Sequence, residues 1–390
     1  MTLVFFWHAL IELSLGLVAL GWVGLAVDGA LGLRKIPSLF RVAPLEDAAC
    51  PSVSILFAAR DEQEKLSEAL ATFLALDYPR YEVVAVDDRS VDATGQILDA
   101  AAQKDPRLKV VHVTSLPAGW LGKTYGLQQA FEHSSGEWLV LTDADMHFAP
   151  DVLRRAIALA KTKQWDHMPL LAEAKLYTFG EKVVMTFFAC AFVMATRPWS
   201  VSNPKSHTYI GVGAFQLIRR SAYEKMGTHR RLALEVIDDV KVGKLVKEAG
   251  CRSGVAKAGS AVSVHWHSGV RNIIRGTEKN FYAATGFRVW MAAAQLVSIF
   301  LAWIFPWLAL PFVHGWARAF AVIAIVLPVL AQAGAAREFR VSMLYALTQP
   351  VGALIFCWML LRSTVITLRN GGITWRGTFY PTEELKRGVV

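Results

Sequence analysis

The chain has 390 residues, of which 54% are hydrophobic and only 19% are charged, and its mean hydropathy is +0.35. This composition is too apolar for an ordinary soluble protein, so part of the chain is expected to lie in a membrane. The formal net charge of +9 is spread along the chain and accompanies no nucleic-acid-binding motif, which excludes nucleic acid as the expected partner and favours anionic lipid headgroups.

The first segment is apolar over residues 3–27, long enough for a helix to cross a bilayer, which takes roughly 20 residues. We predict an uncleaved transmembrane anchor over residues 1–30, because the segment is long for a signal peptide and lacks a basic start. Basic residues follow it at positions 34, 35 and 41, and by the positive-inside tendency they place the next segment in the cytoplasm.

An α/β domain is predicted over residues 50–285. Apolar runs that read as buried strands alternate with segments of helical character; the strands are expected at 53–59, 81–86, 108–113 and from 138, and the helices at 64–76, 92–102 and 124–133. Such alternation predicts a mostly parallel sheet covered by helices on both faces.

Carboxylates stand at the ends of the predicted strands, in the motifs Arg60-Asp61-Glu62, Asp87-Asp88 and Asp143-Ala144-Asp145. In an α/β sheet, ligands bind at the carboxyl ends of parallel strands. Asp143 and Asp145 are hard oxygen ligands of the kind that suits Mg²⁺ or Mn²⁺ bridging a diphosphate. An isolated Asp-x-Asp is also a common polar turn after a strand, so its value depends on the other two motifs.

In this order and spacing, the three motifs resemble the GT-A domain of family 2 glycosyltransferases, which are inverting enzymes that use nucleotide-diphosphate sugars. The resemblance implies a GT-A fold, Rossmann-like with a mostly parallel sheet, which would lie between the N-terminal and C-terminal transmembrane helices expected from the apolar segments. It further implies a nucleotide pocket formed by Ala59, Asp61, Glu62 and Asp88. The sugar diphosphate and its metal would be held by Asp143 and Asp145. For Asp88 an alternative stays open, since Asp88-Arg89-Ser90 could cap the following helix.

A loop with two glycines and a lysine precedes the predicted helix at 124–133. Its sequence Gly-Trp-Leu-Gly-Lys-Thr, at 119–124, lacks P-loop spacing but resembles the family branch that acts on hopanoid and carotenoid-type lipids. Free backbone N–H groups and the Lys123 ammonium would form an anion site there. Lys123 is therefore a candidate donor-binding residue, with a solvated helix start as the alternative.

Two adjacent acids, Asp238 and Asp239, complete the catalytic candidates. The resemblance makes Asp239 the base, and an inverting transfer needs a carboxylate that takes the proton of the acceptor hydroxyl. The alternative is structural, with Asp238 as a helix N-cap and Asp239 as an ordinary first-turn residue. The Gln-x-x-Arg-Trp run of processive polysaccharide synthases is missing, which favours transfer of a single sugar. The region that replaces it leaves the roles of several residues open, namely His265, Trp266, His267, Arg271 and Arg275; the two histidines alternate on an expected strand.

Apolar sequence returns at 289–368, where candidate spans at 289–313, 319–336 and 343–368 give two or three crossings before a basic, cytoplasmic-type tail at 369–390. In that tail, Trp375-Arg376-Gly377 either folds back on the active site or anchors the chain at the membrane interface. The shorter apolar run 183–193 is expected to be a core helix or an interfacial helix.

These features together predict a family 2 glycosyltransferase of hexosyltransferase type in the cell (inner) membrane, with its catalytic domain in the cytoplasm. It would move one sugar from a nucleotide-diphosphate sugar, expected to be UDP-linked, to a lipid acceptor such as a hopanoid or carotenoid, using Mg²⁺ or Mn²⁺. Two alternatives remain: transfer to a polyprenyl phosphate, and a non-catalytic sugar-nucleotide-binding partner in a lipid-synthesis complex.

Overall fold

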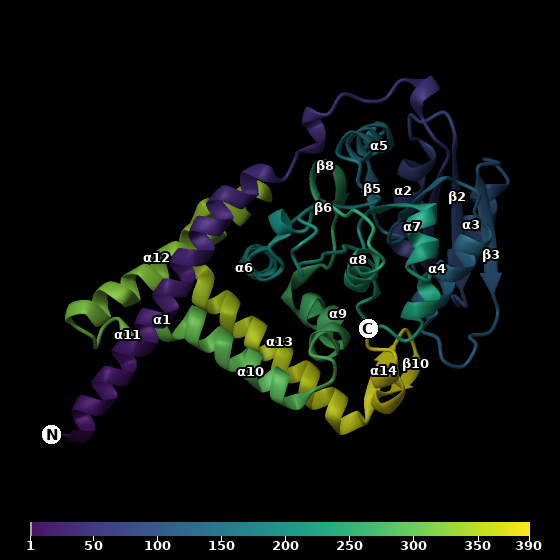
Figure 1. Ribbon diagram of the computed structural model, residues 1–390. Coiled ribbons are helices and arrows are strands. Elements are labelled where there is room, and N and C mark those ends of the chain that lie inside the picture. Colours follow the sequence, from purple (N-terminus) through teal and green to yellow (C-terminus); the bar gives the residue numbers. More distant parts are fainter. Residues whose placement is uncertain (1) are drawn as a thin grey trace. The chain divides into compact units, whose positions relative to one another are not determined.

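The computed structural model describes residues 2–390, with side chains from residue 6 onward, so residue 1 of the predicted anchor lies outside the described residues. The chain forms two compact units (Figure 1). The helical unit contains residues up to 35, 176–197 and 267–372, and the α/β unit contains residues 36–175, 198–266 and 373–390. The predicted α/β domain at 50–285 is thus interrupted, because residues 176–197 and 267–285 pack with the other helices of the helical unit.

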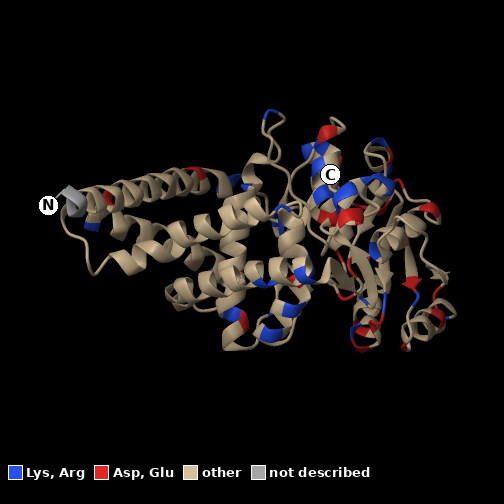
Figure 2. Cartoon of the chain, turned by 90° about the horizontal axis from the view of Figure 1, so that it is seen from below, with Lys and Arg blue, Asp and Glu red and all other residues tan. Residues whose placement is uncertain are grey.

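Helices, most of them apolar, make up the helical unit. They are α1 (Thr2–Gly32), α6 (Phe179–Thr196), α9 (Gly269–Ala284), α10 (Val289–Ile299), α11 (Phe305–Ala309), α12 (Gly315–Glu338) and α13 (Gln349–Asn370). Charged side chains are sparse along most of them (Figure 2). Among the described residues, five helical stretches are long and apolar enough to cross a membrane, namely Phe6–Lys35, Phe179–Ser200, Val289–Ala309, Gly315–Glu338 and Met343–Asn370.

Helix α6 extends the apolar run that is expected from the sequence to be a core or interfacial helix. Its start is fixed by a capping box, in which Thr178 Oγ1 accepts from the Glu181 backbone N–H and the Glu181 carboxylate accepts from the Thr178 N–H. Phe187 and Cys190 lie in the core of the helical unit, packed among residues of α1, α12 and α13. The helix is therefore longer than its apolar run and belongs to the helical unit.

The α/β unit follows the predicted alternation. Its elements are β1 (Val53–Ala59), α2 (Gln63–Leu74), β2 (Tyr81–Asp88), α3 (Thr94–Ala102), β3 (Leu108–Val113), α4 (Gly122–Glu132), β4 (Trp138–Leu141), β5 (His147–Phe148), α5 (Val152–Lys163), β6 (His167–Ala174), β7 (Gln216–Arg219), α7 (Arg220–Lys225), α8 (Asp238–Glu248) and β8 (Ala256–Val264). Later come β9 (Gly372–Trp375), β10 (Thr378–Pro381) and α14 (Thr382–Arg387). Strand β8 ends at Val264, so the expectation that His265 and His267 alternate on a strand is wrong: both lie in the loop that follows.

The central sheet has the strand order β3-β2-β1-β4-β7-β6-β8-β5. Strands β1, β2, β3 and β4 run parallel, whereas β7 runs antiparallel to both of its neighbours and β5 antiparallel to β8. The predicted α/β class is confirmed, with a sheet that is parallel through its first half. Strands β2 and β3 are added on one side of β1, and β4 is added on its other side, so the strand order reverses between β1 and β4. Such switch points are where ligands bind in open α/β sheets.

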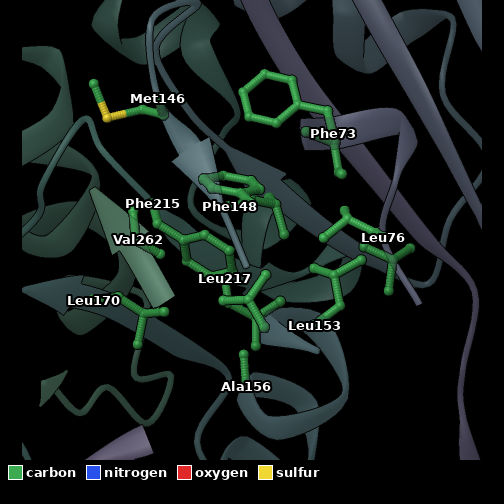
Figure 3. Close-up of a cluster of buried hydrophobic side chains, with 14 of the residues drawn as sticks. Phe73, Leu76, Met146, Phe148, Leu153, Ala156, Leu170, Phe215, Leu217 and Val262 are labelled. Atoms are coloured by element: carbon green, nitrogen blue, oxygen red, sulfur yellow. The ribbon is translucent and has the colours of Figure 1, made fainter. Parts of the chain in front are cut away.

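A buried aromatic cluster fixes the segment that carries Asp143 and Asp145. Figure 3 shows Phe148 between Phe73 and Phe215, and the ring centroids lie 4.6 Å and 5.2 Å apart. Met146 and Phe148 are buried, whereas Asp143 and Asp145 are half-buried. Burying a side chain of this size stabilises the fold by about 2 to 3 kcal/mol. The core therefore anchors the segment that follows the two carboxylates.

Candidate functional site

The ends of β1 and β2 carry backbone strain at the predicted nucleotide pocket. Asp61 and Arg89 both adopt left-handed conformations, with φ of 53° and 56°. Such conformations cost on the order of 1 kcal/mol or more for residues with a side chain and concentrate at functional sites. The Asp61 carboxylate accepts from the Val91 backbone N–H at 2.9 Å, and the Asp61 N–H donates to Ser90 Oγ at 3.1 Å. Asp61 therefore ties the two strand-end loops together. Ala59 lies buried at the end of β1 and pairs with Asp87 of β2.

Asp88 is only 4% exposed, and its carboxylate already has a strong partner. It accepts from Arg89 Nε at 2.7 Å and from Arg89 Nη2 at 3.0 Å, a bidentate pair. A Cβ atom on Gly122 would lie 2.1 Å from Asp88 Oδ2, so only a glycine lets the start of α4 approach this carboxylate. The capping alternative for this motif is wrong, because Ala93 is the N-cap of α3 and the N–H of Thr94 in its first turn donates to Asp92, which lies outside the motif.

Lys123 lies in the first turn of α4 and points into the site. Its Nζ is 2.8 Å from Asp143 Oδ1 and 3.7 Å from Asp238 Oδ1. Burial opposes the charged form, but the nearby carboxylates of Asp143, Asp238 and Asp239 outweigh it and raise the pKa of Lys123 above its usual value. The alternative of a solvated helix start is wrong, since Lys123 is half-buried and lies between carboxylates of separate elements.

Asp238 and Asp239 occupy the first turn of α8, whose N-cap is Ile237, so the alternative that Asp238 is the N-cap is wrong. Asp238 is buried, whereas Asp239 is half-buried. Asp239 Oδ2 accepts from the Gly213 N–H and Oδ1 from the Val240 N–H, each at 2.9 Å. Burial and then the charges of Asp238 and Asp143 raise the pKa of Asp239 to about 6, against the opposing effect of Lys123. Such a carboxylate is suited to take a proton near neutral pH.

Gly213 connects the Asp-x-Asp motif to the Asp239 carboxylate. Its carbonyl accepts from the Asp143 N–H at 2.9 Å, and its own N–H donates to Asp239. A Cβ atom here would lie 2.6 Å from Asp143 Oδ2 and 3.3 Å from Asp239 Oδ2. The two carboxylates therefore face the same small space beside this glycine. Its place in Gly-Val-Gly was the only sequence signal for this role.

Asp145 pairs with a residue that sequence patterns do not single out. Lys65 of α2 donates to Asp145 Oδ2 at 3.1 Å and to the main-chain oxygens of His265 and Trp266 at 3.2 Å and 3.3 Å. Burial and the charge of Asp143 raise the pKa of Asp145, while Lys65 lowers it. Nothing in the helical pattern of α2 distinguishes Lys65 from a solvated lysine, so only the fold reveals this contact.

The two acids of the Asp-x-Asp motif fit a hard divalent cation. Both present carboxylate oxygens and interact electrostatically, so a cation between them would relieve the repulsion that Asp143 exerts on Asp145. Within residues 2–390 the structure brings together no group of three or more His, Cys, Asp or Glu that could hold a metal by itself. This donor set therefore matches an ion that takes one or two carboxylates from the protein and completes its shell with phosphate oxygens and water.

A buried tyrosine and histidine stand behind Asp238. Tyr223 OH lies 2.5 Å from His229 Nδ1, and His229 Nε2 lies 3.6 Å from Asp238 Oδ2. All three side chains are buried. They were not predicted, because Tyr223 and His229 belong to α7 and the turn after it and form no recognisable motif with the acids.

Glu62, which follows β1, interacts electrostatically with the acids of the site. Its carboxylate accepts from Arg376 Nη2, and it also feels the charges of Asp145, Lys65 and Asp143. Burial raises the pKa of Glu62, and Arg376 opposes that rise. The predicted residues from β1, β4 and α8 thus lie in one charge cluster. Arg271 and Arg275 lie on α9 of the helical unit, where both are exposed.

Comparison with known proteins identifies the family to which this part of the chain is similar. Residues 54–227 match the family model described as Glycosyl transferase family 2. A stretch of 148 residues is 34% identical to the beta-monoglucosyldiacylglycerol synthase of Synechocystis sp., and covers 35% of this chain and 30% of that protein. A stretch of 115 residues is 36% identical to the undecaprenyl-phosphate 4-deoxy-4-formamido-L-arabinose transferase of Edwardsiella ictaluri, and covers 28% of this chain and 33% of that protein. The chain therefore matches about a third of the length of these relatives.

Among solved structures, the mannosyltransferase PcManGT of Pyrobaculum calidifontis, in complex with GDP-Man and Mn²⁺, has a similar fold. The alignment covers 92% of this chain and 99% of that protein, with a TM-score of 0.53 and 19% sequence identity. At this identity the likeness concerns the fold alone.

Proposed function

We infer that the glycosyl transferase family 2 domain carried by this chain is a working glycosyltransferase that moves one sugar from a nucleotide-diphosphate donor to a membrane lipid. The observation that carries this proposal is the contact of Gly213 with both Asp143 and Asp239, next to the Lys123 ammonium. A non-catalytic sugar-nucleotide-binding protein would need the first carboxylate and the lysine, but not a half-buried acid with a raised pKa beside them.

The donor would lie along the carboxyl ends of β1, β2 and β4. We assign the nucleotide to Ala59, Asp61, Glu62 and Asp88, and the sugar diphosphate to Asp143, Asp145 and Lys123. Asp143 and Asp145 would hold Mg²⁺ or Mn²⁺, and when bound this ion would neutralise charge on the leaving diphosphate. The Lys123 ammonium supplies positive charge at the same place, and it is already oriented by Asp143.

The transfer would be a single displacement with inversion at the sugar C1 atom. The acceptor hydroxyl oxygen forms a bond to C1 while the bond from C1 to the diphosphate oxygen breaks, and the hydroxyl proton passes to the Asp239 carboxylate. The backbone N–H groups of Gly213 and Val240 hold that carboxylate in one orientation. Asp238 stays buried behind it, between Lys123 and His229, and its negative charge helps to raise the pKa of Asp239.

The acceptor is proposed to be a lipid, and the donor a UDP-sugar. The names of the two relatives, a glucosyldiacylglycerol synthase and an undecaprenyl-phosphate sugar transferase, support a lipid acceptor. The loop motif at 119–124 supports a hopanoid or carotenoid-type lipid. Five apolar helices in the described residues support a place in the cell membrane. The basic residues at positions 34, 35 and 41, which follow the first of them, support a catalytic domain on the cytoplasmic side.

The test is transfer by the purified full chain in lipid nanodiscs. UDP- and GDP-linked hexoses would be supplied with Mg²⁺ or Mn²⁺ and a panel of acceptors: a hopanoid alcohol, a hydroxylated carotenoid, diacylglycerol and undecaprenyl phosphate. We expect metal-dependent transfer of one sugar, lost in Asp145→Ala together with donor binding. Asp239→Asn should keep donor binding but lose transfer, and Asp99→Asn, on the exposed side of α3, should behave as the unaltered protein. Nucleotide-sugar binding without turnover on any acceptor would favour the non-catalytic partner instead.

A further inference from the structure

The chain returns to the α/β unit after its last long helix and forms a small hairpin there. Strands β9 and β10 pair across a two-residue turn made by Arg376 and Gly377, with φ of 48° and 75°. Positive φ at both central residues is typical of the tight turns that suit hairpins, where the first position usually holds Asn, Asp or Gly. Arginine at that position is strained, and as a central residue of the turn it lies at the tip of the hairpin.

The tip contacts the motif at the end of β1. Arg376 donates from Nη2 to the Glu62 carboxylate and from Nη1 to the Asp61 carbonyl at 3.4 Å. In return, Arg60 Nη1 donates to Thr378 Oγ1 at 3.3 Å. The hairpin is therefore attached to the strand end that carries the predicted nucleotide residues.

The second strand of the hairpin reaches the loop that carries Lys123. Tyr380 is 6% exposed, and its hydroxyl accepts from the Gly122 N–H at 3.3 Å. The same hydroxyl interacts with the Arg89 guanidinium, which pairs with Asp88. One hairpin thus contacts residues from β1, from the loop after β2 and from the start of α4, far from it in the sequence.

We propose that Arg376 binds the phosphates of the nucleotide-sugar donor, and that the β9–β10 hairpin is the element that positions it. This inference rests on the proposed function of the domain. A diphosphate that enters the acidic cluster needs cations in addition to Lys65 and Lys123, whose charges Asp145 and Asp143 already offset. Arg376 is also paired, with Glu62, but its guanidinium has five N–H donors and keeps some of them for another acceptor. The Arg376 side chain lies beside Glu62, which is close enough to feel the charges of Asp143 and Asp145, and it remains 44% exposed. Its planar fork of N–H donors matches phosphate oxygens.

The experiment compares the affinities of the full chain for UDP and for uridine, with GDP and guanosine as a parallel pair. Arg376→Ala should weaken UDP binding about tenfold or more, since it removes charge-assisted hydrogen bonds to phosphate, and leave uridine binding within about twofold. Arg376→Lys, which keeps the charge but loses the fork, should fall between. The matched control is Arg387→Ala, an exposed arginine on α14 of the same tail, which should change neither affinity.

Equal weakening of UDP and uridine in Arg376→Ala would overturn the phosphate role and leave a purely structural one. Unchanged UDP binding would overturn it as well, and the proposed function would stand in both cases. Failure of the unaltered chain to bind either diphosphate would instead overturn the proposed function together with this role.

Discussion

Lys123 Nζ lies 2.8 Å from Asp143 Oδ1, so the first turn of α4 supplies the counter-ion for the Asp-x-Asp motif that follows β4. The same nitrogen lies 3.7 Å from Asp238 Oδ1 at the start of α8. One ammonium therefore offsets the repulsion between carboxylates from two elements that the proposed transfer needs side by side.

Replacing Lys123 by methionine should abolish transfer and weaken diphosphate binding by about tenfold or more, because a charged hydrogen bond contributes roughly 1.5 to 3 kcal/mol. Asp143, Asp238 and Asp239 would also lose the charge that offsets their repulsion. Calorimetric titration with UDP and a transfer assay would measure both effects. Lys104→Met, at an exposed lysine beyond α3, is the control. Normal UDP affinity in a folded Lys123→Met protein would contradict the assigned role.

Transfer activity should depend on the protonation of Asp239. Its pKa is raised to about 6, and the base must be deprotonated, so kcat/KM, which reports groups of the free enzyme, should rise through about pH 6 and level off above it. Because Lys123 opposes the rise of this pKa, any residual activity of Lys123→Met should show the same limb at a higher pH. A rate that does not change between about pH 5 and about pH 7 would exclude Asp239 as the base.

Gly213→Ala should reduce transfer strongly. The new Cβ atom would lie 2.6 Å from Asp143 Oδ2, closer than such atoms pack, so the carboxylate must shift. A misplacement of about 1 Å in such a site can lower the rate by about a hundredfold. Gly334→Ala is the matched control, since a Cβ atom on Gly334 meets nothing within 4 Å. An alanine at 213 that leaves the rate unchanged would show that the space beside Gly213 is not used.

Acid should destabilise the α/β unit through His167. This buried side chain bonds to Ser253 and Gln216, and burial lowers its pKa to about 4, with Gln216 opposing. The unfolded chain, with a histidine pKa near 6.5, binds the proton that the folded chain excludes, so stability falls as pH drops from about 6.5 to about 4. The loss is on the order of 3 kcal/mol.

Thermal unfolding of the full chain across that pH range would measure this loss. His133→Gln, at an exposed histidine, should keep the pH dependence, whereas His167→Gln should reduce it. If His167→Gln retains the full acid dependence, the effect arises from other groups.

The sequence by itself identified the strands of the α/β unit and the acids at their ends. Strands 53–59 and 108–113 have the predicted bounds. The first is a buried and mostly apolar run, as is typical of a central parallel strand, whereas the second lies at the edge of the sheet and exposes Lys109 and His112. The sequence also identified Lys123, Asp143 and Asp239 as candidates, because each belongs to a motif of neighbouring residues that can be recognised in the sequence. The observed α/β sheet and the match of residues 54–227 to the glycosyl transferase family 2 model agree with these predictions.

Only the tertiary structure decided which of these residues touch and what else joins them. Lys65 and His229 carry no local pattern, since each acts on a residue from another element. Trp375-Arg376-Gly377 had two equal interpretations from the sequence, and the hairpin packs on the α/β unit. Periodicity reports how a segment packs along its own length, whereas a contact between distant segments depends on how the whole chain folds around its core.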